Sequence, residues 1–161
     1  QIVMSIERAK AHLKNKGYLD RVIEPEAGTF TVEDAARALG CEPAHIAKTM
    51  SFYAPDNEKT ILVVAAGDAK IDNRKFRDAL GVKPHMLKMD EVEPRIGHAP
   101  GGVCAFGIND GVSVYCDVSL KRFDYVYPAA GNDHSGVKLN CDELYDACDA
   151  KGWVDVCKGW E

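Results

Sequence analysis

The sequence lacks any long hydrophobic run. Its most apolar stretches, TILVVAAG (60–67) and AHIAKTMSFYA (44–54), are short and flanked by polar residues. A helix that crosses a bilayer needs about 20 consecutive apolar residues, so neither stretch predicts a membrane span. No charged segment followed by an apolar one marks a secretory leader. We therefore expect a cytoplasmic protein that makes no contact with a membrane.

Paired metal-ligand spacing is also missing. The six cysteines form no C-x-x-C pair and no Cys/His cluster typical of zinc sites. An even number of cysteines would permit disulfides, but a chain of 161 residues can build a core without them. We expect free thiols that mostly fill the core, and no metal or other cofactor. The six are Cys41, Cys104, Cys116, Cys141, Cys148 and Cys157.

Positive charge is scarce overall, because the net charge is -5. This argues against binding nucleic acid over the whole surface. One segment is clearly basic, KIDNRKFRDALGVKPHMLK (70–88). A solvated helix and loop explains it on composition alone, and a local contact with phosphates is the functional alternative.

What is present predicts one domain, since the length suits a single core and 46% of the residues are hydrophobic. Apolar spacing and capping residues predict helices over 5–17, 31–40, 72–81 and 140–152. Alternating or β-branched runs predict strands at 48–54, 59–67, 102–108, 112–117, 123–131, 137–140 and 153–156. The first two and the next two strands are expected to form hairpins. We predict an α/β fold of the α+β type, one compact domain with a curled, mixed, mostly antiparallel sheet flanked by helices. Residues 1–29 would be an N-terminal helix and lead-in, and 30–157 the core.

The stretch GHAPGGVCAFG (97–107) holds four glycines. It fits neither nucleotide-binding glycine motif, because a strand rather than a helix is expected after it. It also lacks the G-x-S-x-G of a nucleophile elbow. Gly101 and Gly102 can turn backbone N–H groups toward a carbonyl or a developing oxyanion, although a tight strand entry explains them equally well. Cys104 is a candidate nucleophile with no activating partner visible in the sequence.

Two further polar features of the sequence are candidates for a binding site. Lys48 shares a strand face with Met50 and Phe52. A lysine on an apolar face must extend its ammonium to solvent, pair with an acid, or line a pocket where it holds an anion or polarises a carbonyl. In the loop GNDHSG (131–136), His134 is a candidate proton carrier or hydrogen-bond donor. A solvated hairpin loop is the alternative.

Several of these stretches together resemble one family. They are TVEDAARALG (31–40), HIAKTMSF (45–52), ILVVAAGD (61–68), G-x-x-x-G-G-V (97–103) and Ala-Ala-Gly (129–131). The combination resembles the YbaK/ProX family of aminoacyl-tRNA deacylases, related to the editing domain of bacterial prolyl-tRNA synthetases, over roughly residues 30–157. The resemblance implies hydrolysis of the ester between a wrong amino acid and the terminal adenosine of a tRNA, commonly proline tRNA. Water attacks without a metal, helped by the substrate's own hydroxyl.

The resemblance also implies a site. Lys48 stands where the family has its functional lysine and would hold the 3′ end of the substrate, while the backbone of Gly101 and Gly102 faces the scissile carbonyl. The expected substrate-binding residues are Thr31, Met50, His98, Val103, Gly131, His134 and Gly136. The expected tRNA-binding residues are Lys70, Arg74, Lys75 and Lys88.

The sequence departs from the family at three places. It has Ile96-Gly97-His98 where members often have Thr-Gly-Tyr, and Ala105 where they often have proline. Gly136 stands near a position that is acidic or hydroxylated in several members. These differences concern the choice of substrate and the strength of catalysis.

Three functions remain in view. The first is a trans-editing hydrolase that removes a small wrong amino acid such as Ala, Cys or Ser from proline tRNA, with the acceptor end as its partner and a synthetase as a candidate partner. The second is a non-catalytic module that binds an amino acid, a nucleotide or charged tRNA. The third is a cysteine hydrolase that uses Cys104.

Overall fold

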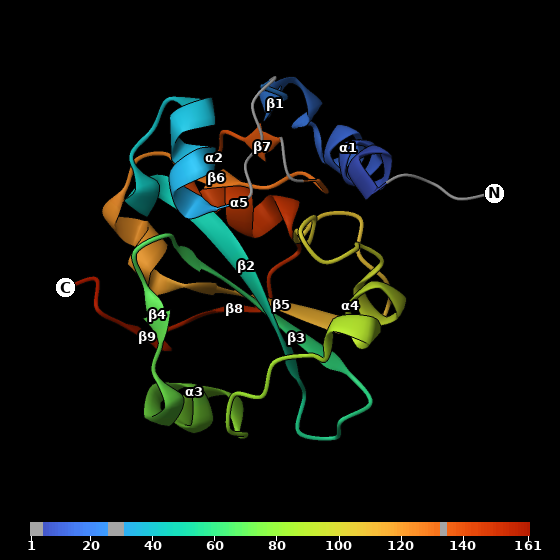
Figure 1. Ribbon diagram of the computed structural model, residues 1–161, viewed down its shortest axis with the longest axis vertical. Coiled ribbons are helices and arrows are strands. Elements are labelled where there is room, and N and C mark those ends of the chain that lie inside the picture. The colour runs from blue at the N-terminus through green and yellow to red at the C-terminus, as the bar shows by residue number, and fades with distance from the viewer. Residues whose placement is uncertain (1–4, 26–30, 133–134) are drawn as a thin grey trace.

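The computed structural model describes residues 5–25, 31–132 and 135–161. Its centre is a five-stranded sheet in the order β6-β2-β3-β5-β8 (Figure 1). Two short antiparallel pairs, β1 with β7 and β4 with β9, lie outside it. The strands are β1 (Val22–Ile23), β2 (Ile46–Tyr53), β3 (Thr60–Ala66), β4 (Lys70–Ile71), β5 (Val112–Asp117), β6 (Tyr127–Pro128), β7 (Gly136–Val137), β8 (Gly152–Val154) and β9 (Cys157–Lys158).

Three of the helices, α2, α3 and α5, begin at the capping residues that the sequence suggests. Thr31 Oγ1 accepts the N–H of Asp34, Asp72 accepts that of Lys75, and Asn140 forms a capping box with Glu143. The α-helices are α1 (Ser5–Lys16), α2 (Val32–Leu39), α3 (Asn73–Leu80), α4 (Met89–Ile96) and α5 (Cys141–Ala147). The 3-10 turns are η1 (Leu19–Arg21), η2 (Pro43–His45) and η3 (Val118–Arg122).

The predicted α/β domain with a mixed sheet is confirmed, but its strands are not mostly antiparallel. β2 and β3 form the expected antiparallel hairpin, with Lys48 opposite Ala65. The β2–β6, β3–β5 and β5–β8 pairs are all parallel. Parallel neighbours need a long crossover. Between β3 and β5, α3 and α4 supply it, so β5 enters the sheet beside β3 from the same end.

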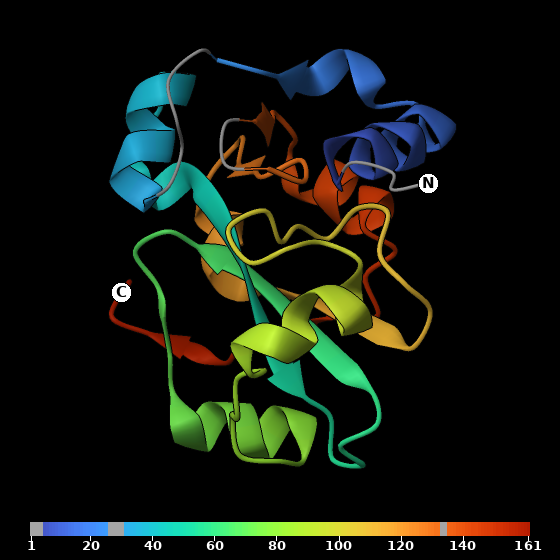
Figure 2. The same cartoon turned by 45° about the vertical axis from the view of Figure 1, so that its right-hand side comes forward.

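The predicted strand 102–108 is wrong, and with it the second hairpin. These residues belong to an irregular loop, which we call the glycine-rich loop (residues 97–109), between α4 and β5. The turn at Asn109-Asp110-Gly111 ends this loop, and the Gly111 carbonyl accepts the N–H of Thr60. Figure 2 shows the loop, in yellow, lying between α1 and α4.

The core is built on β3, the central strand, every residue of which is buried. Strands covered on both faces read as continuous apolar runs, which explains ILVVAA. Phe52 and Phe76 pack with ring centroids 4.7 Å apart and tie α3 to the sheet. All six cysteines are free and four are buried: Cys104, Cys116, Cys148 and Cys157. Of the described helices, none is long and apolar enough to span a bilayer.

Candidate functional site

A cavity of about 230 Å³ opens at the start of β2. It lies between α2, the glycine-rich loop and the segment that runs from β6 toward β7. The α2 side contributes mainly apolar groups, and β2 and the two loops contribute most of the polar ones. The lining residues are Thr31, Val32, Ala35, Leu39, Ile46, Ala47, Lys48, Thr49, Gly101, Val103, Tyr127, Ala129, Asn132 and Ser135.

Lys48 is half-buried in the wall of this cavity. Its ammonium donates to the Gly67 carbonyl at 3.4 Å and to the Ala69 carbonyl. Among the described residues it forms no ion pair. Burial lowers the pKa of Lys48, and the nearby Asp68 carboxylate, itself bound by Arg122, opposes that shift. Of the three alternatives for this lysine, no acid pairs with it among the described residues, and the residue lines the cavity while backbone carbonyls hold its ammonium.

The two central glycines of the glycine-rich loop have different surroundings. Gly101 lines the cavity with φ at +90°, in the left-handed region that glycine adopts readily. The Gly102 N–H is engaged, because it donates to the Ala99 carbonyl at 2.9 Å and closes a turn. A β-carbon on Gly102 would lie 2.6 Å from the Gly131 carbonyl oxygen. Gly102 thus allows the loop to pack against the backbone at residues 131–132.

His98 lies in the interior, apart from the cavity lining. Its Nε2 is 2.7 Å from the Phe106 carbonyl, which can only accept, so Nε2 carries the proton. Its Nδ1, 2.9 Å from Ser5 Oγ, then accepts from that hydroxyl. Burial lowers the pKa of His98 and keeps the ring neutral.

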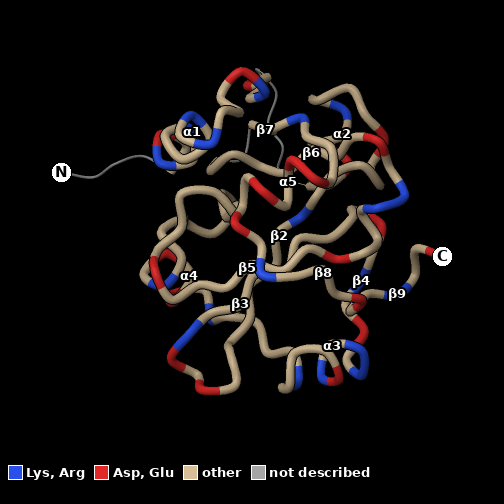
Figure 3. Tube along the Cα trace, turned by 180° about the vertical axis from the view of Figure 1, so that it is seen from behind, with Lys and Arg blue, Asp and Glu red and all other residues tan. Residues whose placement is uncertain are grey.

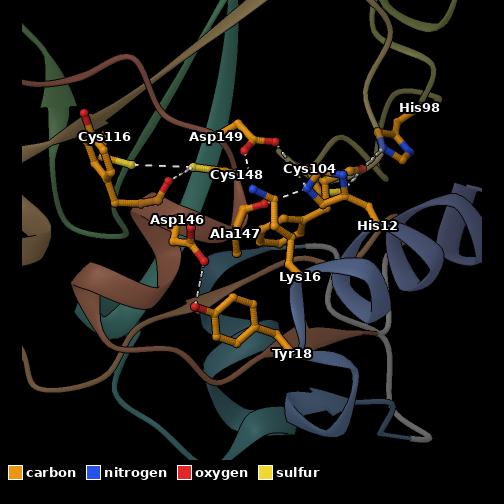
Figure 4. A network of polar contacts seen from close by, with 12 residues as sticks. His12, Lys16, Tyr18, His98, Cys104, Cys116, Asp146, Ala147, Cys148 and Asp149 are labelled. Atoms are coloured by element: carbon orange, nitrogen blue, oxygen red, sulfur yellow. Dashed lines mark hydrogen bonds and ion pairs between the residues drawn. The ribbon is translucent and has the colours of Figure 1, made fainter.

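Cys104 has the neighbour that the sequence did not reveal: its Sγ lies 3.5 Å from His98 Nε2 (Figure 4). However, this nitrogen is protonated and already donates to Phe106, so it cannot take the thiol proton. Burial also raises the pKa of Cys104 to about 12. The thiol is fully buried and protonated at neutral pH, which is the opposite of an activated nucleophile.

The remaining predicted residues fall around the cavity rather than all in it. Thr31 and Val103 line it directly. Gly131 precedes the lining residue Asn132, and Gly136 packs against Leu39, where a β-carbon would lie 2.6 Å from Cδ1. Met50 lies two residues after Lys48 in β2 and is not among the lining residues. His134 lies outside the described residues.

Sequence reasoning missed two polar residues of the wall, Thr49 and Tyr127, and it proposed the loop 131–136 without assigning a role to Asn132 or Ser135. Ser135 is almost fully buried, and its Oγ accepts the N–H of Ala130 at 3.2 Å, which shapes the turn. The polar run GNDHSG was the available signal for Asn132 and Ser135. Within the described part of the chain, no cluster of three His, Cys, Asp or Glu side chains could hold a metal.

The four basic residues expected to bind tRNA are spread over a long surface. Lys70 is exposed and follows Ala69, whose carbonyl accepts a hydrogen bond from Lys48. Arg74 is exposed on α3, toward the end of the molecule opposite α2 (Figure 3). Lys75 is bound to Asp155 at 3.3 Å and to the Cys157 carbonyl at 3.1 Å. Lys88 is exposed and precedes α4.

Comparison with known proteins identifies one family and several similar proteins. The family model described as the aminoacyl-tRNA editing domain matches residues 26–147. The uncharacterized protein YwhH of Bacillus subtilis (strain 168) is 44% identical over 158 residues, covering 98% of this chain and 100% of that protein. A proline–tRNA ligase of Limosilactobacillus fermentum is 29% identical over 110 residues, 66% of this chain but only 19% of the ligase.

A solved structure agrees over the whole length. It is described as "a putative trans-editing enzyme for prolyl tRNA synthetase" and superposes with a TM-score of 0.87 at 26% identity, covering 99% of this chain and 100% of that one. The family match spans the cavity-lining parts of α2, β2 and both loops. The chain therefore belongs to the aminoacyl-tRNA editing domain family.

Proposed function

We propose that this protein is a trans-editing hydrolase that deacylates mischarged tRNA, with proline tRNA carrying Ala, Cys or Ser as its substrate. One observation carries the proposal. A single small cavity brings together a partly desolvated lysine ammonium, the bare backbone of Gly101 and an apolar wall. Family membership and the named function of the structural neighbour support it.

In this proposal, Lys48 binds the 3′ end of the tRNA. An ammonium has three N–H donors. Among the described residues two of them are held by the Gly67 and Ala69 carbonyls, which fixes the direction of the third. That donor is left for an oxygen of the terminal nucleotide, and a partly dehydrated cation holds such an oxygen more strongly than one in water.

The ester carbonyl then lies against the glycine-rich loop. Gly101 offers its backbone to the substrate with no side chain in the way. The N–H of Gly102 already donates to the Ala99 carbonyl, so this residue contributes by packing against the backbone at Gly131. Water adds to the carbonyl carbon, with the substrate's hydroxyl assisting proton transfer. The acyl C–O bond breaks, which releases the free amino acid and leaves the terminal ribose hydroxyl on the tRNA.

Selection follows from the size and polarity of the cavity. Val32, Ala35 and Leu39 give α2 an apolar face toward it, and about 230 Å³ accommodates a small aminoacyl group beside the sugar. A pocket rejects an oversized side chain more sharply than it separates two small ones. We propose that the protein acts as a size sieve for Ala, Cys or Ser, and the assay with Pro-tRNA shows whether the cognate amino acid is spared.

The rest of the tRNA would contact the protein weakly and locally. We assign Lys70, Arg74 and Lys88 to the phosphates of the acceptor stem, with a smaller contribution from Lys75 because Asp155 already binds it. Such contacts are compatible with a net charge of -5 and weaken as salt is added. The substrate also places the protein in the cytoplasm, beside the synthetase that makes it.

The proposal is tested with proline tRNA charged separately with Ala, Cys, Ser and Pro. Wild-type protein should release at least one of the three small amino acids far faster than buffer does, and should leave Pro-tRNA intact. Binding of each charged tRNA is measured in parallel. Tight binding without release of any amino acid would contradict the proposal and establish the alternative, a non-catalytic binding module.

Deprotonation of Lys48 should weaken substrate binding at high pH. Burial lowers the pKa of Lys48 from its usual value of 10.5, so the ammonium is lost at a lower pH than on an exposed lysine. We expect KM for mischarged tRNA to rise as the pH is raised through this pKa. Lys48→Arg should show no such rise, because arginine stays protonated throughout. Single-turnover rates at increasing pH, corrected for spontaneous hydrolysis, check this, and parallel profiles for the two proteins would contradict it.

Cys104→Ala should leave the activity intact. The thiol is buried and protonated, and His98 cannot act as its base, so kcat/KM should change by less than about twofold. Steady-state deacylation by the variant checks this. A loss of several orders of magnitude in a folded variant would instead support the cysteine hydrolase.

A further inference from the structure

The two ends of the glycine-rich loop meet at one side chain on α1. Arg8 Nη1 donates to the Gly97 carbonyl at 3.1 Å, and Nη2 donates to Asn109 Oδ1 at 2.9 Å. The Asn109 amide is itself oriented, since its Nδ2 donates to the Pro94 carbonyl at the end of α4 at 3.2 Å. The planar guanidinium thus bridges the first and last residues of the loop.

A second link joins the loop to α1 inside this bridge. Ser5 donates to His98 over 2.9 Å, and His98 donates over 2.7 Å to the Phe106 carbonyl, which can only accept. The first turns of α1 therefore hold both arms of the loop. Gly101 and Val103, which line the cavity, lie on the excursion between those arms.

The backbones approach closely enough to exclude side chains. A β-carbon on Gly107 would lie 2.6 Å from the Arg8 carbonyl oxygen. One on Gly131 would lie 2.5 Å from the Ser5 carbonyl oxygen. Glycine at these positions lets α1 pack directly behind two loops that form the cavity wall.

The other end of α1 is fixed to α5 (Figure 4). His12 Nε2 donates to the Ala147 carbonyl at 2.6 Å, and Lys16 pairs with Asp149. Just beyond the helix, the Tyr18 hydroxyl donates to Asp146 at 2.9 Å. Arg8 and His12 are four residues apart and share one helix face. The helix is thereby anchored on α5 and presents Arg8 to the loop.

We propose that Arg8 is a positioning residue that clasps Gly97 and Asn109 and so holds Gly101 and Val103 at the cavity. This gives α1 a part in the site, although the helix precedes residues 26–147, the part of the chain that the family model matches. The expected effect on turnover rests on the proposed function. The expected effect on the loop does not.

The first test is amide hydrogen exchange of Arg8→Ala, with Lys14→Ala, an exposed position on the same helix, as the matched control. Exchange of residues 97–109 should become at least about tenfold faster while the amides of β3 keep their protection, because only the local opening is made easier. Asn109→Leu removes one of the two acceptors and should give the same pattern more weakly. It also tests the proposal if Arg8→Ala does not fold.

The second test is kinetic. In Arg8→Ala, kcat for deacylation should fall by about tenfold or more with little change in KM, since Lys48 still binds the tRNA end while the carbonyl is misplaced. Arg8→Lys keeps the charge but replaces the planar guanidinium, whose Nη1 and Nη2 each reach one acceptor, by a single nitrogen, so kcat should recover only in part. Unchanged exchange in the loop, or equally faster exchange in β3, would overturn the inference. An inactive wild type would overturn the proposed function alone.

Discussion

Lys48→Met should abolish most of the deacylation while leaving the protein folded. The substitution keeps the apolar stem of this cavity-lining residue and removes its ammonium, which donates to the Gly67 and Ala69 carbonyls. We expect kcat/KM to fall by about 100-fold, the equivalent of the ~2–3 kcal/mol that a charge-assisted hydrogen bond contributes. Rates on mischarged proline tRNA, measured beside the spontaneous rate, check this.

The matched control for this loss is Lys59→Met. Lys59 is exposed at the turn that joins β2 and β3, at the far end of the same hairpin. It should retain full activity. The unfolding free energy of Lys48→Met should equal or exceed that of the wild type, because burial already disfavours the ammonium. Full activity in folded Lys48→Met would remove this lysine from the mechanism.

Gly67→Ala should strongly destabilise the fold. A β-carbon on Gly67 would lie 2.1 Å from the Pro43 carbonyl oxygen and 2.8 Å from Val32 Cγ1. The nearest obstacle is backbone of η2, which cannot move aside as a flexible side chain would. We expect the unfolding free energy to fall by about 2–3 kcal/mol, as in other overpacked sites, with the m-value unchanged. Urea denaturation of the two proteins measures it.

Gly152→Ala is the control for this prediction. Its β-carbon would meet only Tyr115 Cδ1, at 3.9 Å, which is an ordinary contact. Stability should then change by less than about 0.5 kcal/mol. Equal unfolding free energies of Gly67→Ala and wild type would contradict the prediction and show that the η2 backbone can move away from the added β-carbon. In that case the Gly67 carbonyl would not be rigidly held against Lys48.

Local chemistry made much of this molecule predictable. The N-termini of three helices were predicted from Thr31, Asp72 and Asn140, because a capping side chain acts within one turn of its helix. The alternation of apolar residues and the polar turn between them predicted the hairpin of β2 and β3. The same alternation singled out Lys48, since a charged group on an apolar face needs an explanation.

The features that sequence reasoning missed depend on contacts between distant residues. The glycine-rich loop has the composition of a strand entry, but both of its ends accept hydrogen bonds from Arg8, which is 89 residues before Gly97. His98 was expected to bind substrate because of the family resemblance. It is buried instead because Ser5 and Phe106 satisfy both ring nitrogens. The parallel pairing of β3 and β5 leaves no local signal, since the crossover that causes it includes two helices.

The most direct test of the central claim is to locate the substrate's reactive end on the protein. The probe is an alanyl adenosine in which an amide replaces the ester, so that it binds without being hydrolysed. NMR shifts of labelled protein should change at Lys48, Gly101, Val103 and Ser135, and stay constant on α3. A probe that perturbs α3 alone, or leaves the cavity residues unchanged at saturation, would contradict the account.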